Sequence, residues 1–315
     1  MLKKLPVYLT PLIWLSLFVL PQFLDGYTLS QLSIYLCYGL LAMSLSLIWG
    51  QVGLLCLGQA IFFGIGAYAM SLATLDKVPL LLNLSTGQQS VGLLLAVVLP
   101  MLLAFFISLL LFNGSALDGA FLGLVTLALA VVAERFFEHW RYAGGVNGLF
   151  GVPGLMWGGR ELGETAVYYV TLGLSSIVAL GLYSVKYSAW GLLLKTVREN
   201  ESRTNHLGVN TVRIKMLAFV ASAGIAGLAG ALFVTQFFFV SPNLVGFALS
   251  TEVLIWVAVG GRFSFTAAFL GAISVRLLEN YLGDTFGNYW QLVLGFVFIV
   301  VVLFFPKGVF GKVAK

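Results

Sequence analysis

The chain has 315 residues, of which 60% are hydrophobic and only 9% are charged, and its mean hydropathy is +1.01. This composition excludes an ordinary soluble domain, because apolar stretches of about 20 residues, long enough to cross a bilayer, recur along the chain. The formal net charge of +5 comes from basic residues scattered between those stretches, so the chain lacks the basic stripe that nucleic-acid binding requires.

The apolar stretches are continuous rather than alternating, which is typical of membrane-spanning helices and not of a membrane β-barrel. We therefore expect an all-α fold, a polytopic transmembrane helical bundle of about ten spans. The expected spans are residues 6–24, 29–49, 52–74, 91–112, 120–137, 166–183, 216–239, 245–259, 265–282 and 289–305. The whole chain, 1–315, is expected to form one transmembrane domain with an outer loop at 139–165 and a cytoplasmic segment at 187–212.

The distribution of basic residues predicts the orientation. An even number of spans places both termini on one side, together with Lys3, Lys4, Arg262 and the polar segment 187–212. Loops rich in lysine and arginine face the cytoplasm, so we expect both termini to be cytoplasmic. The chain is thus expected to be a multi-pass protein of the cell (inner) membrane. Cys37 and Cys56 fall inside apolar stretches, which predicts two buried thiols.

The third predicted span, GLLCLGQAIFFGIGAYAM, is interrupted by glycines at positions 53, 58, 64 and 66. The eighth span ends in a second interruption, Gly260-Gly261-Arg262, and a Leu-Ile-Trp phrase precedes each one, at 47–49 and at 254–256. Broken apolar segments in corresponding halves of a transporter indicate a substrate path, although a three-residue echo also arises by coincidence. The seventh span, AFVASAGIAGLAGAL, repeats small residues every four positions, which favours close helix packing.

The longest strongly polar run is LLLKTVRENESRTNHLGVNTVRIK, residues 192–215. Glu199 precedes Arg203 by four residues, the favoured order for an ion pair on a helix. Gly208 would end this helix, and Asn210 or Thr211 would cap the next one. The segment is either a solvated cytoplasmic loop or a docking helix for a partner.

The sequence contains little that could power transport or perform catalysis. The stretch nearest to a P-loop, PKGVFGKV, has Pro306 in place of the first glycine. Ion-coupled carriers keep acids in mid-membrane, whereas Glu134, Arg276 and Glu279 are expected toward span ends, which disfavours a carrier. Glu134 and Glu138 would share a helical face, and a structural charge network with the nearby arginines is the favoured interpretation over an enzymatic carboxylate pair.

Several phrases occur in an order typical of one family: GLLCLGQAIFFGIGAYAM, DGAFLGLVTLALA, AGGVNGLFGVPG, VRENESRTNHLGVNTVRIKMLAFVASAGIAGLAGAL, STEVLIWVAVGGR and FFPKGVFG. The chain resembles the membrane permease subunits of the high-affinity branched-chain amino-acid ABC importers, and the closely similar urea-type permeases. The resemblance covers residues 35–311 and is most specific from VREN to LAGAL. The family commonly has a further glycine after the double glycine, whereas here Arg262 is followed by Phe263.

The resemblance implies a permease subunit of an importer for branched-chain amino acids or small amides such as urea. It implies a second permease of similar fold, cytoplasmic ATP-binding subunits and an extracytoplasmic solute-binding protein as partners, besides the lipid bilayer. This chain would hold no cofactor and would not be an enzyme, because ATP and Mg²⁺ would bind the partner subunits. The alternative is a self-sufficient ion-coupled secondary transporter of a small polar solute.

The resemblance also implies that the polar segment holds the coupling helix that enters a groove on the ATPase. Its apolar side chains would be buried in the groove, and its charged side chains would pair at the rim. The predicted coupling residues are Leu193, Lys195, Val197, Arg198, Glu199, Asn200, Glu201, Arg203, Leu207 and Gly208. The candidates for the translocation path or gate are Gln59, Gly58, Thr126, Asn147, Gly145, Gly260 and Gly261. For Gln59 and Asn147 the alternative is a structural hydrogen bond.

Overall fold

A computed structural model describes residues 9–75, 89–112, 120–286 and 308–310, together with residues 295, 299 and 303. The helices are α1 (Leu9–Val19), α2 (Gly26–Leu45), α3 (Gln59–Thr74), α4 (Gln89–Phe112), α5 (Ala120–His139), α6 (Glu164–Tyr187), α7 (Ala189–Glu199), α8 (Glu201–His206), α9 (Thr211–Phe237), α10 (Phe247–Gly260) and α11 (Phe265–Phe286). Short helical turns are η1 (Leu20–Gln22), η2 (Ser46–Val52), η4 (Arg141–Ala143), η5 (Gly145–Asn147) and η6 (Pro242–Leu244). The strands are β1 (Leu149–Phe150), β2 (Met156–Trp157), β3 (Arg160–Glu161) and β4 (Phe239–Val240).

The prediction of a helical membrane protein is confirmed. Within the described ranges, five helices are long and apolar enough to cross a membrane: Gly26–Val52, Gln89–Phe112, Glu164–Tyr187, Thr211–Phe237 and Pro242–Gly260. Two shorter apolar helices, Pro11–Gln22 and Gln59–Thr74, accompany them. The expected tenth span, 289–305, lies outside the continuously described residues.

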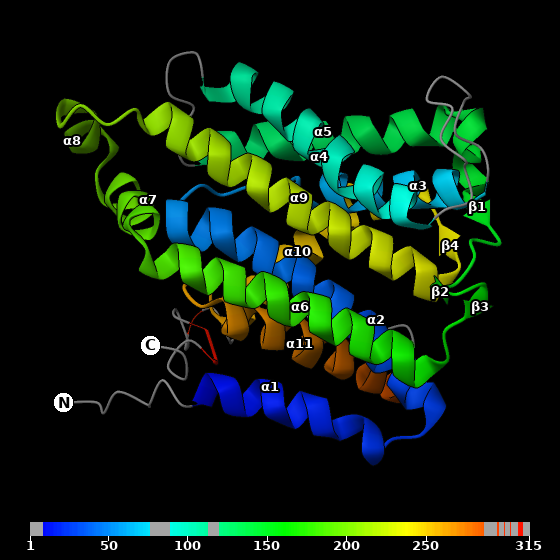
Figure 1. Cartoon of the computed structure of the whole chain (residues 1–315). Coiled ribbons are helices and arrows are strands. Elements are labelled where there is room, and N and C mark those ends of the chain that lie inside the picture. The colour runs from blue at the N-terminus through cyan, green and yellow to red at the C-terminus, as the bar shows by residue number, and fades with distance from the viewer. Residues whose placement is uncertain are drawn as a thin grey trace.

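The long helices run side by side along one common direction (Figure 1). At one end lie α7 and α8, and at the other lie the four short strands. The strands form two antiparallel pairs, β1 with β4 and β2 with β3. Residues 308–310 join the α7 end, because the Val309 and Phe310 amides donate to the carbonyls of Val259 and Gly260 at the end of α10.

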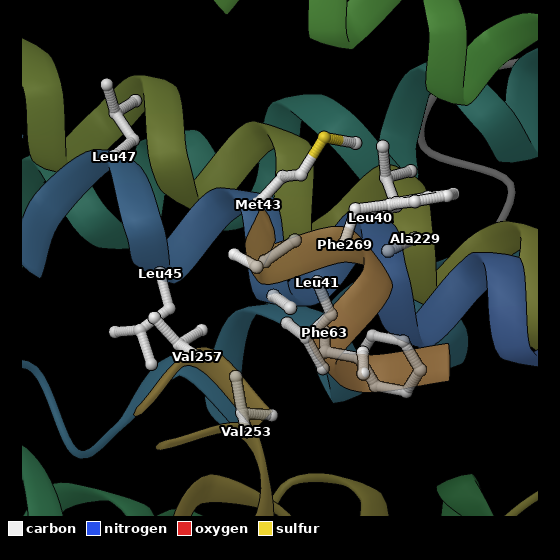
Figure 2. Packing of buried hydrophobic residues seen from close by; sticks show 14 of the residues in the cluster. Leu40, Leu41, Met43, Leu45, Leu47, Phe63, Ala229, Val253, Val257 and Phe269 are labelled. Carbon is white, nitrogen blue, oxygen red and sulfur yellow. The ribbon is translucent and has the colours of Figure 1, made fainter. Parts of the chain in front are cut away.

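Helix α2 lies at the centre of the bundle and is buried along most of its length. Figure 2 shows side chains of α2 and η2 packed among residues of α3, α9, α10 and α11. The labelled contributors from those four helices are Phe63, Ala229, Val253, Val257 and Phe269. Cys37 and Cys56 are both buried and free, as predicted. In a bilayer the most apolar helices can face lipid: the window of α4 is more apolar (mean hydropathy 2.9) but only 22% buried, whereas the window from Gly26 to Val52 (mean hydropathy 1.8) is 83% buried.

Helices α3, α4 and α9 approach closely through small residues. A Cβ atom at Gly230 would collide with the carbonyl oxygen of Phe63, and one at Gly227 would collide with that of Ala96. Gly66 of α3 faces Gly227 in the same way. Lipid tails are as apolar as leucine, so close backbone packing rather than exclusion from water holds such helices together. The small-residue repeat of the seventh span therefore marks a real contact.

This contact yields a stability prediction. Gly230→Val forces α9 away from the Phe63 carbonyl and should destabilise the protein by about 1–3 kcal/mol. The measurement is the apparent melting temperature in detergent. Gly181→Val is the matched control, because nothing lies within 4 Å of a Cβ at Gly181 in α6. Equal melting temperatures for the two variants would contradict the packing account.

Candidate functional site

The third span is broken, as its glycines predicted. Helix α2 continues into the π-helical turn η2, which ends at Gly53 with φ +87°. Residues 53–58 then run without helix, and α3 begins only at Gln59. The 16 residues of α3 cover roughly 24 Å, less than the hydrocarbon thickness, so the irregular stretch completes the crossing.

Side chains from elsewhere satisfy the backbone at this break. The Leu57 amide donates to Thr126 Oγ1 of α5 at 2.9 Å. A Cβ at Gly58 would lie 2.6 Å from the Thr126 carbonyl oxygen, so only glycine allows α5 this close. Two of the predicted path residues, Gly58 and Thr126, are thereby brought together at the start of α3.

Gln59 adjoins them at the centre of the bundle and is 1% exposed. Its Nε2 donates to Ser44 Oγ and to Ser222 Oγ, both at 2.8 Å, so the amide joins α2, α3 and α9. Within the described part of the chain, Gln59 Oε1 is buried and accepts no hydrogen bond. An unpaired buried acceptor costs about 1–3 kcal/mol, and this oxygen is available to a donor that enters the break.

The two glycine interruptions, far apart in sequence, meet in space. Ser46 Oγ donates to the Arg262 carbonyl at 2.9 Å, and Gln51 Nε2 donates to the Phe263 carbonyl at 3.3 Å. Gly260 ends α10, and Gly261 has φ +130°. These two glycines shape the turn between α10 and α11, at the α7 end of the break rather than beside Gln59.

The two candidates from the outer loop, Gly145 and Asn147, lie apart from the break at Gln59 and from the α10–α11 turn. Gly145 and Asn147 form η5, directly before β1, at the end of the bundle opposite α7 (Figure 1). Gly145 has φ +58°, a conformation in the left-handed region that favours glycine. The seven predicted path residues therefore fall into three groups.

The polar segment forms two short helices instead of one. Asn200 leaves the helical conformation, and its side chain accepts a hydrogen bond from the Arg203 amide, which caps α8. The expected pair of Glu199 with Arg203 is therefore replaced by one with Lys195, at 3.9 Å. Asn210 caps α9 through the Arg213 amide, and Gly208 has φ +82°, both as the pattern indicated.

Three predicted coupling residues make contacts inside this chain. Val197 is buried in the core. Glu201 pairs with Lys215 of α9 and accepts from Thr211 Oγ1 at 3.0 Å. Arg198 Nη1 donates to the Gly50 carbonyl in η2. The sequence analysis assigned all three to contacts with an ATPase, Val197 in its groove and Arg198 and Glu201 at the rim, whereas their visible partners belong to this chain itself.

Arg198 also lines a cavity of about 320 Å³ with Trp49, Gly53, Arg262 and Phe263. The guanidinium carbons of Arg198 and Arg262 lie 5.0 and 4.7 Å from the Phe263 ring centroid. Burial, and the neighbouring charge of Arg198, lower the pKa of Arg262. Two like charges thus stack on one aromatic ring between α7 and the α10–α11 turn.

The remaining coupling candidates face outward. Leu193 is half-buried, and Leu207 is 77% exposed, an unusual position for a leucine at the end of a polar helix. The exposed members of the predicted set are Lys195, Glu199, Asn200, Arg203, Leu207 and Gly208.

One expectation about charges is wrong. Arg276 was expected toward a span end, but it is the twelfth of the 22 residues of α11. Its guanidinium pairs with Glu252 of α10 at 2.7 Å and with Glu279 at 2.8 Å. Sequence reasoning missed Glu252, although an acid inside the apolar phrase STEVLIWVAV was a usable signal.

The acidic pair of α5 does not form an enzymatic carboxylate site. Glu138 pairs with Arg135 at 2.6 Å, while Glu134 Oε2 accepts from the Phe247 amide at 3.4 Å. Each carboxylate thus has its own structural partner. The described ranges contain no group of three or more His, Cys, Asp or Glu residues placed to hold a metal ion.

The fold is that of a helical membrane protein. One of its spans is interrupted, and the side-chain amide of Gln59 is buried at the interruption. A family model described as "Branched-chain amino acid transport system / permease component" matches residues 27–302, so the chain belongs to this family of membrane permeases. A permease component is a transport subunit and not an enzyme, as predicted.

Named relatives agree with this assignment. The chain is 29% identical over 307 residues to the high-affinity branched-chain amino acid transport system permease protein LivM of Escherichia coli, covering 89% of this chain and 69% of LivM. It is 24% identical to the corresponding permease protein BraD of Pseudomonas aeruginosa, with 93% and 96% covered. It is 23% identical to LivH of Escherichia coli, with 94% and 96% covered. No solved structure matches the chain.

The break around Gln59 yields a second prediction. Gln59→Leu removes both cross-helix bonds together with the unpaired Oε1, while Ser44 and Ser222 keep their own donor bonds to backbone carbonyls. Stability should change by less than about 1 kcal/mol, and solute uptake should change at least about threefold. Melting temperature and uptake by the assembled transporter are compared in parallel. Unchanged uptake would return Gln59 to a purely structural role.

Proposed function

We propose that the chain is a permease subunit of an ATP-binding-cassette importer, driven by ATPase subunits that dock on α7 and α8. ATP and Mg²⁺ would bind those partners, and an extracytoplasmic solute-binding protein would deliver the solute. The observation that carries this proposal is the surface of α7–α8, which is polar, exposed and tied to the broken span through Arg198. Family membership supports the same assignment.

The proposal includes an arrangement of ten spans with both termini and α7–α8 in the cytoplasm. The charge pattern supports this side, because α7–α8 and the α10–α11 turn carry most of the basic residues between spans. A second permease of similar fold would complete the path. The relatives LivM and LivH, both permeases of one bacterium, are consistent with such a pair.

The docking surface on this chain would be centred on Leu207. It protrudes at the end of α8, and the exposed charges of Lys195, Glu199 and Arg203 lie on the same pair of helices. An apolar side chain surrounded by charges resembles the core and rim of a protein interface. Val197 and Glu201 would contribute by holding α7 and α8 on the bundle.

Arg198 would carry movement of α7 to the broken span. Its guanidinium donates to the Gly50 carbonyl in η2, a π-helical turn of the kind often found at functional sites. Six residues beyond Gly53 the chain reaches Gln59, so a shift at Gly50 passes directly into the break. This route needs only a displacement of α7 by the docked ATPase.

The proposed substrates are branched-chain amino acids. The relatives named above are all described as permeases for this class, which supports the choice over urea or another small amide. The buried Gln59 Oε1 suits either an ammonium or an amide donor. A self-sufficient ion-coupled carrier is the second candidate, favoured by the charge cluster around Arg276 within the bundle.

Docking is tested by Leu207→Asp. A charge at the centre of the interface should weaken association with the ATPase subunits at least about tenfold, which is about 1.4 kcal/mol. The measurement is co-purification of the ATPase with the membrane-inserted chain. Val146→Asp, at a 73% exposed residue near the opposite end, is the matched control and should not change association. Unimpaired co-purification of the Leu207 variant would remove the docking role.

Transmission is tested by Arg198→Met, which loses the bond to Gly50. ATPase association and ATP hydrolysis should persist, and solute taken up per ATP hydrolysed should fall at least about tenfold. Arg213→Met removes a positive charge from an exposed residue at the start of α9, outside the docking surface, and serves as control. Equal coupling ratios in the two variants would show that Arg198 has no part in transmission.

A further inference from the structure

The charge cluster of α10 and α11 has features of a binding site that are found nowhere else among the described residues. Arg276 lies between Glu252 and Glu279, and its guanidinium carbon is 4.3 Å from the Tyr38 ring centroid and 4.8 Å from that of Trp256. The aromatic rings cover the guanidinium, so the arginine is fixed in place. One cation is thereby shared by two acids within membrane-spanning helices.

Glu252 and Glu279 differ in accessibility. The Glu279 side chain is 7% exposed, whereas that of Glu252 is 31% exposed. Glu252 uses Oε2 for Arg276, and the described residues provide no partner for its Oε1. The exposed carboxylate therefore keeps a free acceptor while the arginine holds it in position.

A track of polar side chains leads to this cluster from the start of α2. Gln31 Nε2 donates to the Tyr27 hydroxyl at 2.6 Å, and Gln31 Oε1 accepts from Asn280 Nδ2 at 3.3 Å. Tyr27, Gln31 and Tyr35 follow one another at four-residue spacing on one face of α2. The track begins at the end of α2 remote from η2, where the strands lie (Figure 1).

The polar track and the charge cluster both lie on helices within the bilayer. Polar groups that face lipid have no water to bond, so a partly exposed polar row must border an aqueous cavity or another protein. The cluster also holds two carboxylates for one guanidinium, a formal charge of −1. In a low-dielectric setting this excess attracts a cation strongly.

We propose that Glu252, positioned by Arg276, binds the ammonium group of a zwitterionic amino acid in the outer half of the translocation path. This inference rests on the proposed function, since it assumes that an amino acid passes through the bundle. Glu252 Oε1 accepts the ammonium hydrogen, and the polar track from Tyr27 to Asn280 lines the route to it. Glu279 keeps Arg276 oriented and does not touch the solute.

Uptake is the first test, in vesicles that hold the complete importer. Glu252→Gln keeps the side-chain size and removes the charge, so maximal leucine uptake should fall at least about tenfold. ATPase association should stay intact, and Glu252→Asp should restore part of the rate. Glu138→Gln removes a carboxylate elsewhere and is the matched control. Wild-type uptake by the Glu252→Gln variant with intact assembly would overturn the proposal.

A second test needs no transport and reads the site directly. Ile255→Cys places a thiol one turn from Glu252 on α10, after Cys37 and Cys56 are replaced by alanine in the complete complex. A cationic methanethiosulfonate reagent should label this thiol about tenfold faster than an anionic one, because a carboxylate concentrates cations nearby. Adding Glu252→Gln should remove most of this preference, and adding Glu138→Gln should preserve it.

The labelling results separate the hypotheses. A preference that survives Glu252→Gln, or labelling no faster than at Leu110→Cys on the exposed face of α4, would overturn the site. If the wild-type importer takes up no branched-chain amino acid, the proposed function fails, while the charge preference of the thiol still decides whether Glu252 is a cation site.

Discussion

The structure depends on the backbone groups freed where α2 and α3 are broken inside the membrane. Without water, each such group requires a protein partner or costs several kcal/mol. Two partners come from elsewhere in the chain, Thr126 of α5 and Arg198 of α7. In return, the Ser46 hydroxyl of η2 donates to the Arg262 carbonyl of the α10–α11 turn. Satisfying one irregular stretch therefore draws the two halves of the chain together. Through the same contacts, a movement of α5, α7 or the α10–α11 turn would be transmitted to the irregular stretch.

A permease subunit that moves solute through a change of conformation needs no catalytic group of its own. Its described residues contain a buried amide network at Gln59, a shared arginine at Arg276 and a polar surface on α7–α8. Arg198 connects the surface to the break. The work of transport would thus enter as movement at one end and reach the solute as a change in the broken span. Close glycine contacts among α3, α4 and α9 give this movement a rigid frame.

Much of this could be predicted from the sequence, because continuous apolar stretches define spans and glycines mark the break. Contacts between distant residues could not. The split at Asn200, the pair of Glu201 with Lys215 and the bond from Arg198 to Gly50 depend on tertiary packing that local periodicity does not encode. Arg276 was misplaced for a related reason: the span boundary was drawn too early, since α11 extends to Phe286. Glu252 was overlooked because one acid scarcely alters the hydropathy of its span.

The central claim is that an external ATPase, and not an ion gradient, drives solute through this chain. The most direct measurement is leucine accumulation in sealed vesicles that contain either the complete importer or this chain alone. The account predicts accumulation only with the complete importer and ATP on the side of α7–α8, and none from a proton or sodium gradient. Gradient-driven accumulation by the chain alone would contradict it.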